Sequence, residues 1–287
     1  MRALSLPGCG CRGAFQFGAL RRLVLAGETF DLVAGASSGS ICGAAHVAGL
    51  SLVGPDVYRT LSSTPVFSRR WLASERSPFG MSWIVRDALS RFIPQDRIVE
   101  SDVELLVSTT RLSPFARNVL REWRAVRAGL GAEPFQGSPI HRVARGNGAL
   151  VVHSSRARAD MHDVIVASCT IPIVYARLPR LDGEIHVDGG AADNTLIDVL
   201  VERGASELTV ITPYEGGAVS PTLFEASRPP RVPPHVRLRL ISPVRPIRLG
   251  RFDFDRGRLE EALSMPHVET IVEPGELVPL ARPRSAS

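Results

Sequence analysis

The chain has 287 residues, of which 44% are hydrophobic and 22% charged, and its formal net charge is +5. These values agree with a single folded domain that buries a sizeable core. No stretch approaches the roughly 20 apolar residues that a membrane-spanning helix requires, and Met1–Leu6 is shorter than the apolar region of an export signal, which needs about 7–15 residues. We therefore expect a cytoplasmic protein with reduced thiols.

The first predicted elements are a strand over 3–6 and a helix over 14–25. The loop between them carries Gly8, Cys9, Gly10, Cys11, Arg12 and Gly13. A glycine-rich loop that opens a helix presents backbone N–H groups to an anion, either a bound phosphate or the oxyanion of an acyl-transfer intermediate. A dinucleotide site would also need an acidic residue at the end of the second strand. Asp31 begins that strand instead, which argues against a dinucleotide.

A second strand over 30–36 and a helix over 41–48 flank the sequence Gly-Ala-Ser-Ser-Gly at 35–39. A serine on a tight strand-to-helix turn needs small residues two positions before and after it, because a Cβ there would collide with the strand or the helix. Gly35 and Gly39 meet this need. Ser37 is therefore the candidate nucleophile, at a helix N-terminus that favours developing negative charge. In a chain with 25 glycines, the same pattern alone also fits an ordinary turn.

Two regions in the middle of the chain have unusual compositions. Residues 62–97 mix aromatic and arginine side chains, which fits either a cap over a substrate pocket or ordinary packing. Residues 111–148 carry seven arginines and two glutamates, a balance equal to the net charge of the whole chain. Apolar residues at helical spacing there predict a basic amphipathic helix that binds an anionic membrane transiently or packs on the core with a solvated basic face. We expect no nucleic-acid partner.

A short strand over 184–188 ends in a carboxylate, Asp188, and is followed by Gly189 and Gly190. Because the carboxyl ends of parallel strands converge on one edge of a sheet, we expect Asp188 to meet Ser37 there as a general base. An Asp-Gly-Gly sequence alone also fits a plain turn. His186 lies on the same face of this strand, and we expect it to be half-exposed.

The remaining predicted strands and helices alternate along the chain. They indicate a three-layer α/β/α fold with a mainly parallel central sheet, in a single domain over 1–280 with a flexible tail over 281–287. The expected strands cover 103–107, 149–152, 207–211 and 236–241, and the expected helices cover 160–168 and 193–203.

Taken together, four ordered segments resemble the patatin-like phospholipase family. Pro7–Leu20 resembles the glycine loop and first helix of the family, and Asp31–Ser40 resembles its serine elbow. Ala167–Pro172 is similar to the segment that precedes the aspartate strand, and Val187–Asn194 is similar to the Asp-Gly-Gly motif with its trailing asparagine. The resemblance extends through most of the chain.

The resemblance implies a serine lipid acyl hydrolase of the phospholipase A or lysophospholipase type, with a Ser-Asp dyad and neither metal nor cofactor. Ser37 would attack the ester, Asp188 would take its proton, and amides of the loop from Gly8 to Gly13 would hold the oxyanion. Expected substrates are phospholipids, lysophospholipids or acylglycerols. Some effectors of this family leave the cell without a signal peptide, so a membrane-peripheral or secreted location also stays open.

Three alternatives remain open at this stage. An acyltransferase would use the same dyad with another acyl acceptor. A lipid-binding protein without turnover would result if Cys9, at a position where family loops more often have glycine, spoils the oxyanion site. An α/β-hydrolase triad would draw its histidine from His235 or His267, although Ser37 follows only one earlier strand. We expect Cys9, Cys11, Cys42 and Cys169 to be small buried hydrophobes; redox sensitivity near Cys9 and Cys11 is a further hypothesis.

Overall fold

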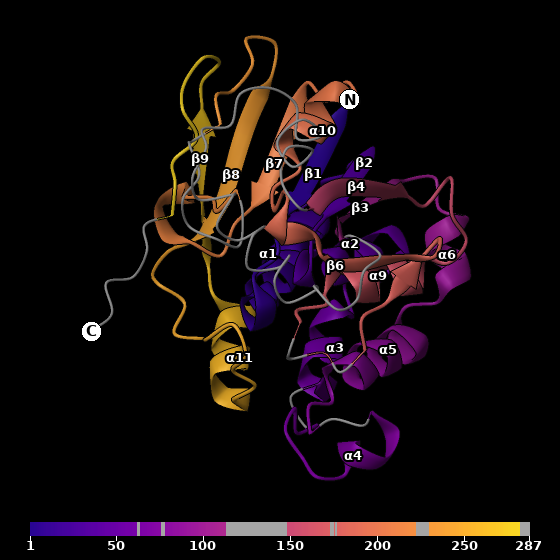
Figure 1. The fold of residues 1–287 in the computed structure, drawn as a ribbon. Helices are drawn as coiled ribbons and strands as arrows, with labels where there is room; N and C mark the ends of the chain where they lie inside the picture. Colours follow the sequence, from indigo (N-terminus) through magenta and orange to yellow (C-terminus); the bar gives the residue numbers. More distant parts are fainter. Residues whose placement is uncertain are drawn as a thin grey trace.

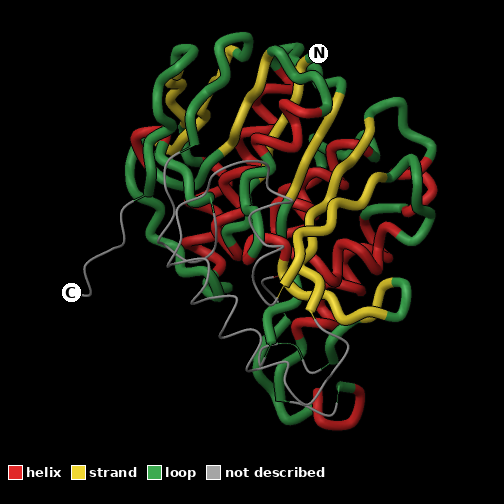
Figure 2. Tube along the Cα trace, turned by 45° about the horizontal axis from the view of Figure 1, so that its top comes forward, coloured by secondary structure: helices red, strands yellow, loops and turns green. Residues whose placement is uncertain are grey.

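A computed structural model describes residues 1–61, 64–75, 78–112, 148–172, 175, 177–221 and 230–281. Its centre is a twisted sheet with the strand order β5-β6-β3-β2-β1-β7-β8-β9, and β4 pairs with β3 (Figures 1 and 2). The strands are β1 (Arg2–Leu6), β2 (Leu32–Gly35), β3 (Glu104–Leu112), β4 (Gly148–Ser154), β5 (Arg180–Leu181), β6 (Glu184–Asp188), β7 (Glu207–Ile211), β8 (Arg237–Pro243) and β9 (His267–Val272).

The middle of this sheet is parallel. Strands β3, β2, β1, β7 and β8 run in the same direction, whereas β4, β5, β6 and β9 pair antiparallel with their neighbours. The parallel strands are short apolar runs such as Leu32–Gly35, which is buried throughout. This is the pattern of strands that are covered on both faces.

Helices cover the sheet, and the fold is the predicted three-layer α/β/α arrangement (Figure 1). A larger apolar cluster joins one set of strand side chains to α1, α2, α9 and α11, and a second cluster joins the alternate set to α10. The described helices are α1 (Gly13–Leu25), α2 (Ser38–Val47), α3 (Gly54–Leu61), α4 (Trp71–Ser74), α5 (Met81–Phe92), α6 (Gln95–Val99), α9 (Met161–Ser168), α10 (Ile197–Glu202) and α11 (Arg256–Ser264).

Strand β3 is longer than its neighbours, and two strands, β2 and β6, pair with the same edge of it. β4 pairs along residues 106–112 of β3, so β2 and β6 must share the opposite edge. There, Gly35 at the end of β2 faces Val107, and Asp188 at the end of β6 faces Thr109. The two strands therefore point their carboxyl ends toward each other, with partners only two residues apart on β3. Two residues span roughly 7 Å of strand.

This arrangement corrects one step of the sequence interpretation. We expected Asp188 to reach Ser37 because parallel strands end at a common edge, but β6 is antiparallel to β3. The two residues approach from opposite directions along β3 instead. The direction of an edge strand depends on long-range pairing, which the local sequence pattern does not encode.

Several other predictions fall partly or wholly outside the described residues. The basic amphipathic helix predicted within 111–148 lies in the undescribed residues 113–147, and nearly all of the predicted tail lies in 282–287. The single-domain boundary and the cap over 62–97 stay predictions, although α4, α5 and part of α6 occupy that range. In the described part of the chain, no helix is both long and apolar enough to cross a lipid bilayer.

Candidate active site

Ser37 lies on a sharp turn between β2 and α2. Its backbone has φ 50° and ψ −129°, a left-handed conformation that non-glycine residues rarely adopt. The two flanking glycines allow this turn, because an added Cβ would lie 2.6 Å from Ser40 Cα at Gly35 and 1.8 Å from the Leu6 carbonyl oxygen at Gly39. The turn places Ser37 at the N-cap of α2, where the helix dipole is positive.

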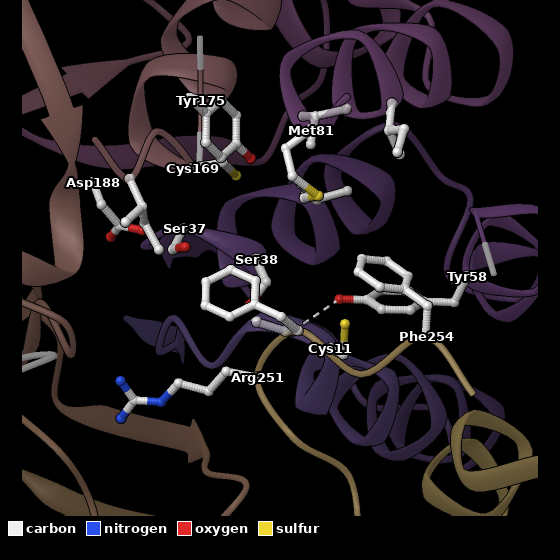
Figure 3. Close-up of a pocket in the computed structure, with 16 residues that line it drawn as sticks. Cys11, Ser37, Ser38, Tyr58, Met81, Cys169, Tyr175, Asp188, Arg251 and Phe254 are labelled. Carbon is white, nitrogen blue, oxygen red and sulfur yellow. Dashed lines mark hydrogen bonds between the residues drawn. The ribbon is translucent and has the colours of Figure 1, made fainter. Parts of the chain in front are cut away.

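Asp188 is fully buried beside this turn, and the Ser37 hydroxyl points toward its carboxylate (Figure 3). Its Oδ1 accepts a hydrogen bond of 2.9 Å from the Gly190 amide, at the start of the 3-10 turn Gly189–Ala191. Its Oδ2 makes no hydrogen bond with the described residues. Burial raises the pKa of Asp188 to about 7, against the opposing effects of the Ser37 hydroxyl and the Gly190 amide.

The end of helix α9 holds both of these residues in place. The Ser37 amide donates a hydrogen bond of 2.8 Å to Ser168 Oγ, and the Asp188 amide donates one of 2.8 Å to the Thr170 carbonyl. On its other side, the Asp188 carbonyl accepts a hydrogen bond from Thr110 Oγ1. Buried hydrogen bonds to the backbone of Ser37 and Asp188 therefore fix the relative positions of the hydroxyl and the carboxylate.

The glycine loop reaches the same place, but four of its amides are already occupied, that of Gly13 by carbonyls of the turn Gly10–Arg12. The Gly8 amide donates to Asn194 Oδ1 at 2.8 Å, the Cys9 amide to Ser38 Oγ at 3.0 Å, and the Cys11 amide to the Arg251 carbonyl at 2.9 Å. These hydrogen bonds shape the loop. They also remove Gly8, Cys9, Cys11 and Gly13 from the amides that can receive an anion without rearrangement.

Two amides beside Ser37 make no hydrogen bond with the described part of the chain: those of Gly10 and Ser38. Gly10 has φ +61°, and an added Cβ would lie 2.2 Å from the Arg251 carbonyl oxygen, so glycine is required there. Arg12 and Gly13 follow at the turn into α1. Sequence reasoning proposed all six loop amides and did not consider the Ser38 amide, which follows the serine directly.

A cavity of about 260 Å³ opens in front of Ser37 (Figure 3). Both Ser37 and Asp188 line it, and most of the other lining groups are apolar or aromatic. Helix α5 contributes Met81, in the region predicted to form a cap, and the loop before α11 contributes Phe254. The cavity can hold an apolar chain next to a hydroxyl and a buried carboxylate.

Comparison with known proteins gives one match to a family. The sequence profile of the family described as patatin-like phospholipase matches residues 4–201, which is more than half of the chain. The chain belongs to the patatin-like phospholipase family. Among solved structures, VipD from Legionella pneumophila resembles it with a TM-score of 0.41 and 14% identity, over 75% of this chain and 50% of that chain. The chain thus spans about half the length of VipD. No curated protein matches the sequence.

In this patatin-like chain, no described histidine lines the cavity that contains Ser37. His267 Nδ1 accepts a hydrogen bond from Arg22 instead. His186 is 3% exposed, not half-exposed as expected. Its Nδ1 lies 2.8 Å from Thr109 Oγ1, and the same hydroxyl lies 2.8 Å from His153 Nε2. Burial lowers the pKa of both imidazoles to about 4, so this cluster is neutral and is bonded within itself.

The four cysteines of this patatin-like chain are buried and form no disulfide. Burial raises the pKa of Cys9 to about 11 and that of Cys11 to about 12, which leaves little reactive thiolate at neutral pH. Cys11 lines the cavity, whereas Cys9 is not among the described residues that do. These observations weaken the hypothesis of redox sensitivity. Among the described residues, no cluster of three or more histidine, cysteine, aspartate or glutamate side chains is arranged to hold a metal ion.

Sequence reasoning missed the contribution of the segment just before α11. Arg251, Phe252 and Phe254 all line the cavity, and the Arg251 carbonyl holds the glycine loop. This segment lies beyond residues 4–201, which match the family, and no motif marks it. Asn194 was noted only as part of a motif. Its side chain clamps Gly8 by accepting from the Gly8 amide and donating to the Gly8 carbonyl at 3.1 Å.

Proposed function

We propose that this protein is a serine lipid acyl hydrolase that cleaves fatty-acyl esters of phospholipids, lysophospholipids or acylglycerols through a Ser37-Asp188 dyad. The observation that carries the proposal is a hydroxyl on a strained turn that faces a buried carboxylate with an unpaired oxygen, inside an apolar cavity. Strain and unpaired buried polar atoms cost stability, and proteins keep them mainly at functional sites.

The reaction follows from this geometry. Asp188 takes the hydroxyl proton as Ser37 Oγ attacks the ester carbonyl, and the carbonyl electrons move to the oxygen to form a tetrahedral oxyanion. When the oxyanion collapses, the alcohol leaves with the proton from Asp188, and an acyl-serine remains. A water molecule then repeats these steps and releases the fatty acid and free Ser37.

We assign the oxyanion hole to the amides of Gly10 and Ser38. Both residues line the cavity beside Ser37, and in the described part of the chain neither amide has another partner. One such donor typically contributes about 10²–10³ in turnover. This assignment needs no contribution from Cys9, whose amide is held by Ser38 Oγ. The proposed oxyanion hole therefore does not depend on which residue stands at position 9.

A fluorophosphonate probe tests the proposal directly. We expect stoichiometric labelling of the native protein, with the label on the peptide that contains Ser37 by mass spectrometry, and release of fatty acid from a short-chain phospholipid. The matched control is Ser264→Ala, which removes an exposed serine on α11 and should leave the labelling unchanged. Labelling at another serine would overturn the dyad. Transfer of the acyl group to an added alcohol in preference to water would instead identify an acyltransferase.

The pH dependence of turnover is a second expected result. Asp188 acts as a base only when it is ionised, and burial raises its pKa to about 7. We therefore expect kcat/KM to rise with pH as a single ionisation with a midpoint near 7 and to level off above it. The measurement is a pH-stat assay between pH 5 and 9 on a soluble short-chain ester. A midpoint near 4, which is usual for an exposed carboxylate, would contradict this role for Asp188.

A further inference from the structure

A second cavity, of about 580 Å³, adjoins the one in front of Ser37. Arg251 lines both cavities. The second cavity is more polar than the first. Its charged and hydroxyl-bearing lining residues are Arg12, Arg251, Tyr214 and Glu215.

The two arginines reach this cavity from opposite ends of the chain. Arg12 donates from Nε to the Leu249 carbonyl at 2.8 Å, and its guanidinium lies 5.9 Å from the centre of the Tyr214 ring. Within the described part of the chain, its two terminal nitrogens make no hydrogen bond. Backbone contact with the glycine loop anchors Arg251, whose Nη2 lies 3.5 Å from the Tyr214 hydroxyl. Both guanidinium groups are thus positioned around one tyrosine.

The charge of this cavity favours an anion. Among the described residues that line it, there are two arginines and a single carboxylate, that of the exposed Glu215. A guanidinium presents a planar fork of N–H donors that matches the oxygens of a phosphate group. In Figure 3 the Arg251 side chain extends away from Phe254 and Tyr58, on the side of the cavity where Ser37 and Asp188 lie.

We propose that the second cavity binds the phosphate of a glycerophospholipid headgroup while the acyl chain occupies the apolar cavity and the ester lies at Ser37. This inference rests on the proposed hydrolase function and narrows its substrate class to phospholipids over neutral acylglycerols. Arg251 lines both cavities and therefore lies between the bound phosphate and the bound acyl chain. The specificity then resides in residues 249–254, outside the part of the chain that matches the family.

The test compares two substrates that differ only in the headgroup: dihexanoylphosphatidylcholine and 1,2-dihexanoylglycerol, both below their micellar concentrations. We expect Arg251→Gln to lower kcat/KM for the phospholipid relative to the diacylglycerol by about tenfold or more, because a hydrogen bond to a charged group is lost. Arg251→Lys should recover part of that ratio. The matched control is Arg248→Gln, at an exposed arginine that lines neither cavity, and it should leave the ratio unchanged. An unchanged ratio in Arg251→Gln would overturn the proposal.

Calorimetric titration with sn-glycerol 3-phosphate separates this inference from the hydrolase proposal. Binding by the wild type that is weakened in Arg251→Gln supports the phosphate site even if neither ester is hydrolysed. Equal binding by both proteins, or no binding by either, overturns it. Inorganic phosphate and glycerol serve as the two reference ligands. Inorganic phosphate that binds as tightly as sn-glycerol 3-phosphate would indicate a site for free phosphate and would overturn the headgroup assignment.

Discussion

Replacing Ser37 by alanine is expected to reduce ester turnover by about 10⁴- to 10⁶-fold, the range seen when a serine nucleophile is removed from a preorganised site. The hydroxyl is the only part of Ser37 that reacts, and the turn, the cavity and the free amides stay in place without it. The measurement is fatty-acid release under single-turnover conditions, together with loss of fluorophosphonate labelling. Turnover within tenfold of the wild type would exclude Ser37 as the nucleophile.

A glycine at the same position gives a control with a different readout. Alanine retains the Cβ and hence the strain of φ 50°, whereas glycine adopts this conformation freely. A residue held in such a region stores about 1–3 kcal/mol. Ser37→Gly should therefore be as inactive as Ser37→Ala and yet more stable to urea. Equal stability of the two variants would show that the turn is not strained.

Asp188→Asn is expected to reduce turnover by about 10²–10⁴-fold, the contribution of a positioned general base. The amide keeps the shape of the side chain but cannot accept the Ser37 proton. Labelling by the fluorophosphonate should slow in parallel, because it needs the same activated hydroxyl. If Asp188→Asn keeps wild-type turnover, another group takes the proton and the dyad is wrong.

The same variant is expected to be more stable than the wild type, by an amount that depends on pH. Burial raises the folded-state pKa of Asp188 from 3.8 to about 7, so stability from this residue is fully present below pH 4 and is lost as pH rises toward 7. Asparagine does not ionise. The stability advantage of Asp188→Asn should therefore grow by about 2–3 kcal/mol between pH 5 and pH 8, at about 1.4 kcal/mol per pKa unit.

Urea unfolding at these two pH values measures the difference. Asp102→Asn is the matched control, because the Asp102 carboxylate is exposed and makes no hydrogen bond with the described residues. Its effect on stability should be small at both pH values. An advantage for Asp188→Asn that does not change with pH would contradict a raised pKa at this site and, with it, the predicted midpoint of the activity profile.

The local parts of this fold could be predicted from the sequence. The strand over 207–211 was placed at its observed limits, and those over 3–6 and 236–241 came within two residues of theirs, because buried strands are short apolar runs with clear ends. The turn at Ser37 was also predictable, because glycines at 35 and 39 indicate positions where the backbone packs too closely for a Cβ. Each of these features depends on neighbours in the chain.

Features that depend on distant contacts could not be predicted. The helix expected over 193–203 is only Ile197–Glu202, because Asp193 Oδ1 accepts the amides of Thr195 and Leu196 and holds the preceding segment in a turn. The loop amides were counted as available, but Asn194, Ser38 and Arg251 occupy three of them. None of these partners can be identified from spacing alone.

The head-to-head meeting of β2 and β6 on β3 determines which changes the protein can tolerate. The separation of the hydroxyl and the carboxylate is set along one strand, from Val107 to Thr109, although Ser37 and Asp188 are 151 positions apart in the chain. Lengthening or shortening the intervening connections leaves that separation unchanged. Inserting one residue into β3 between Val107 and Thr109 would shift it by about 3.4 Å and turn one partner to the opposite face. Substrate-shaping segments can thus diverge in length while the reacting atoms keep their spacing.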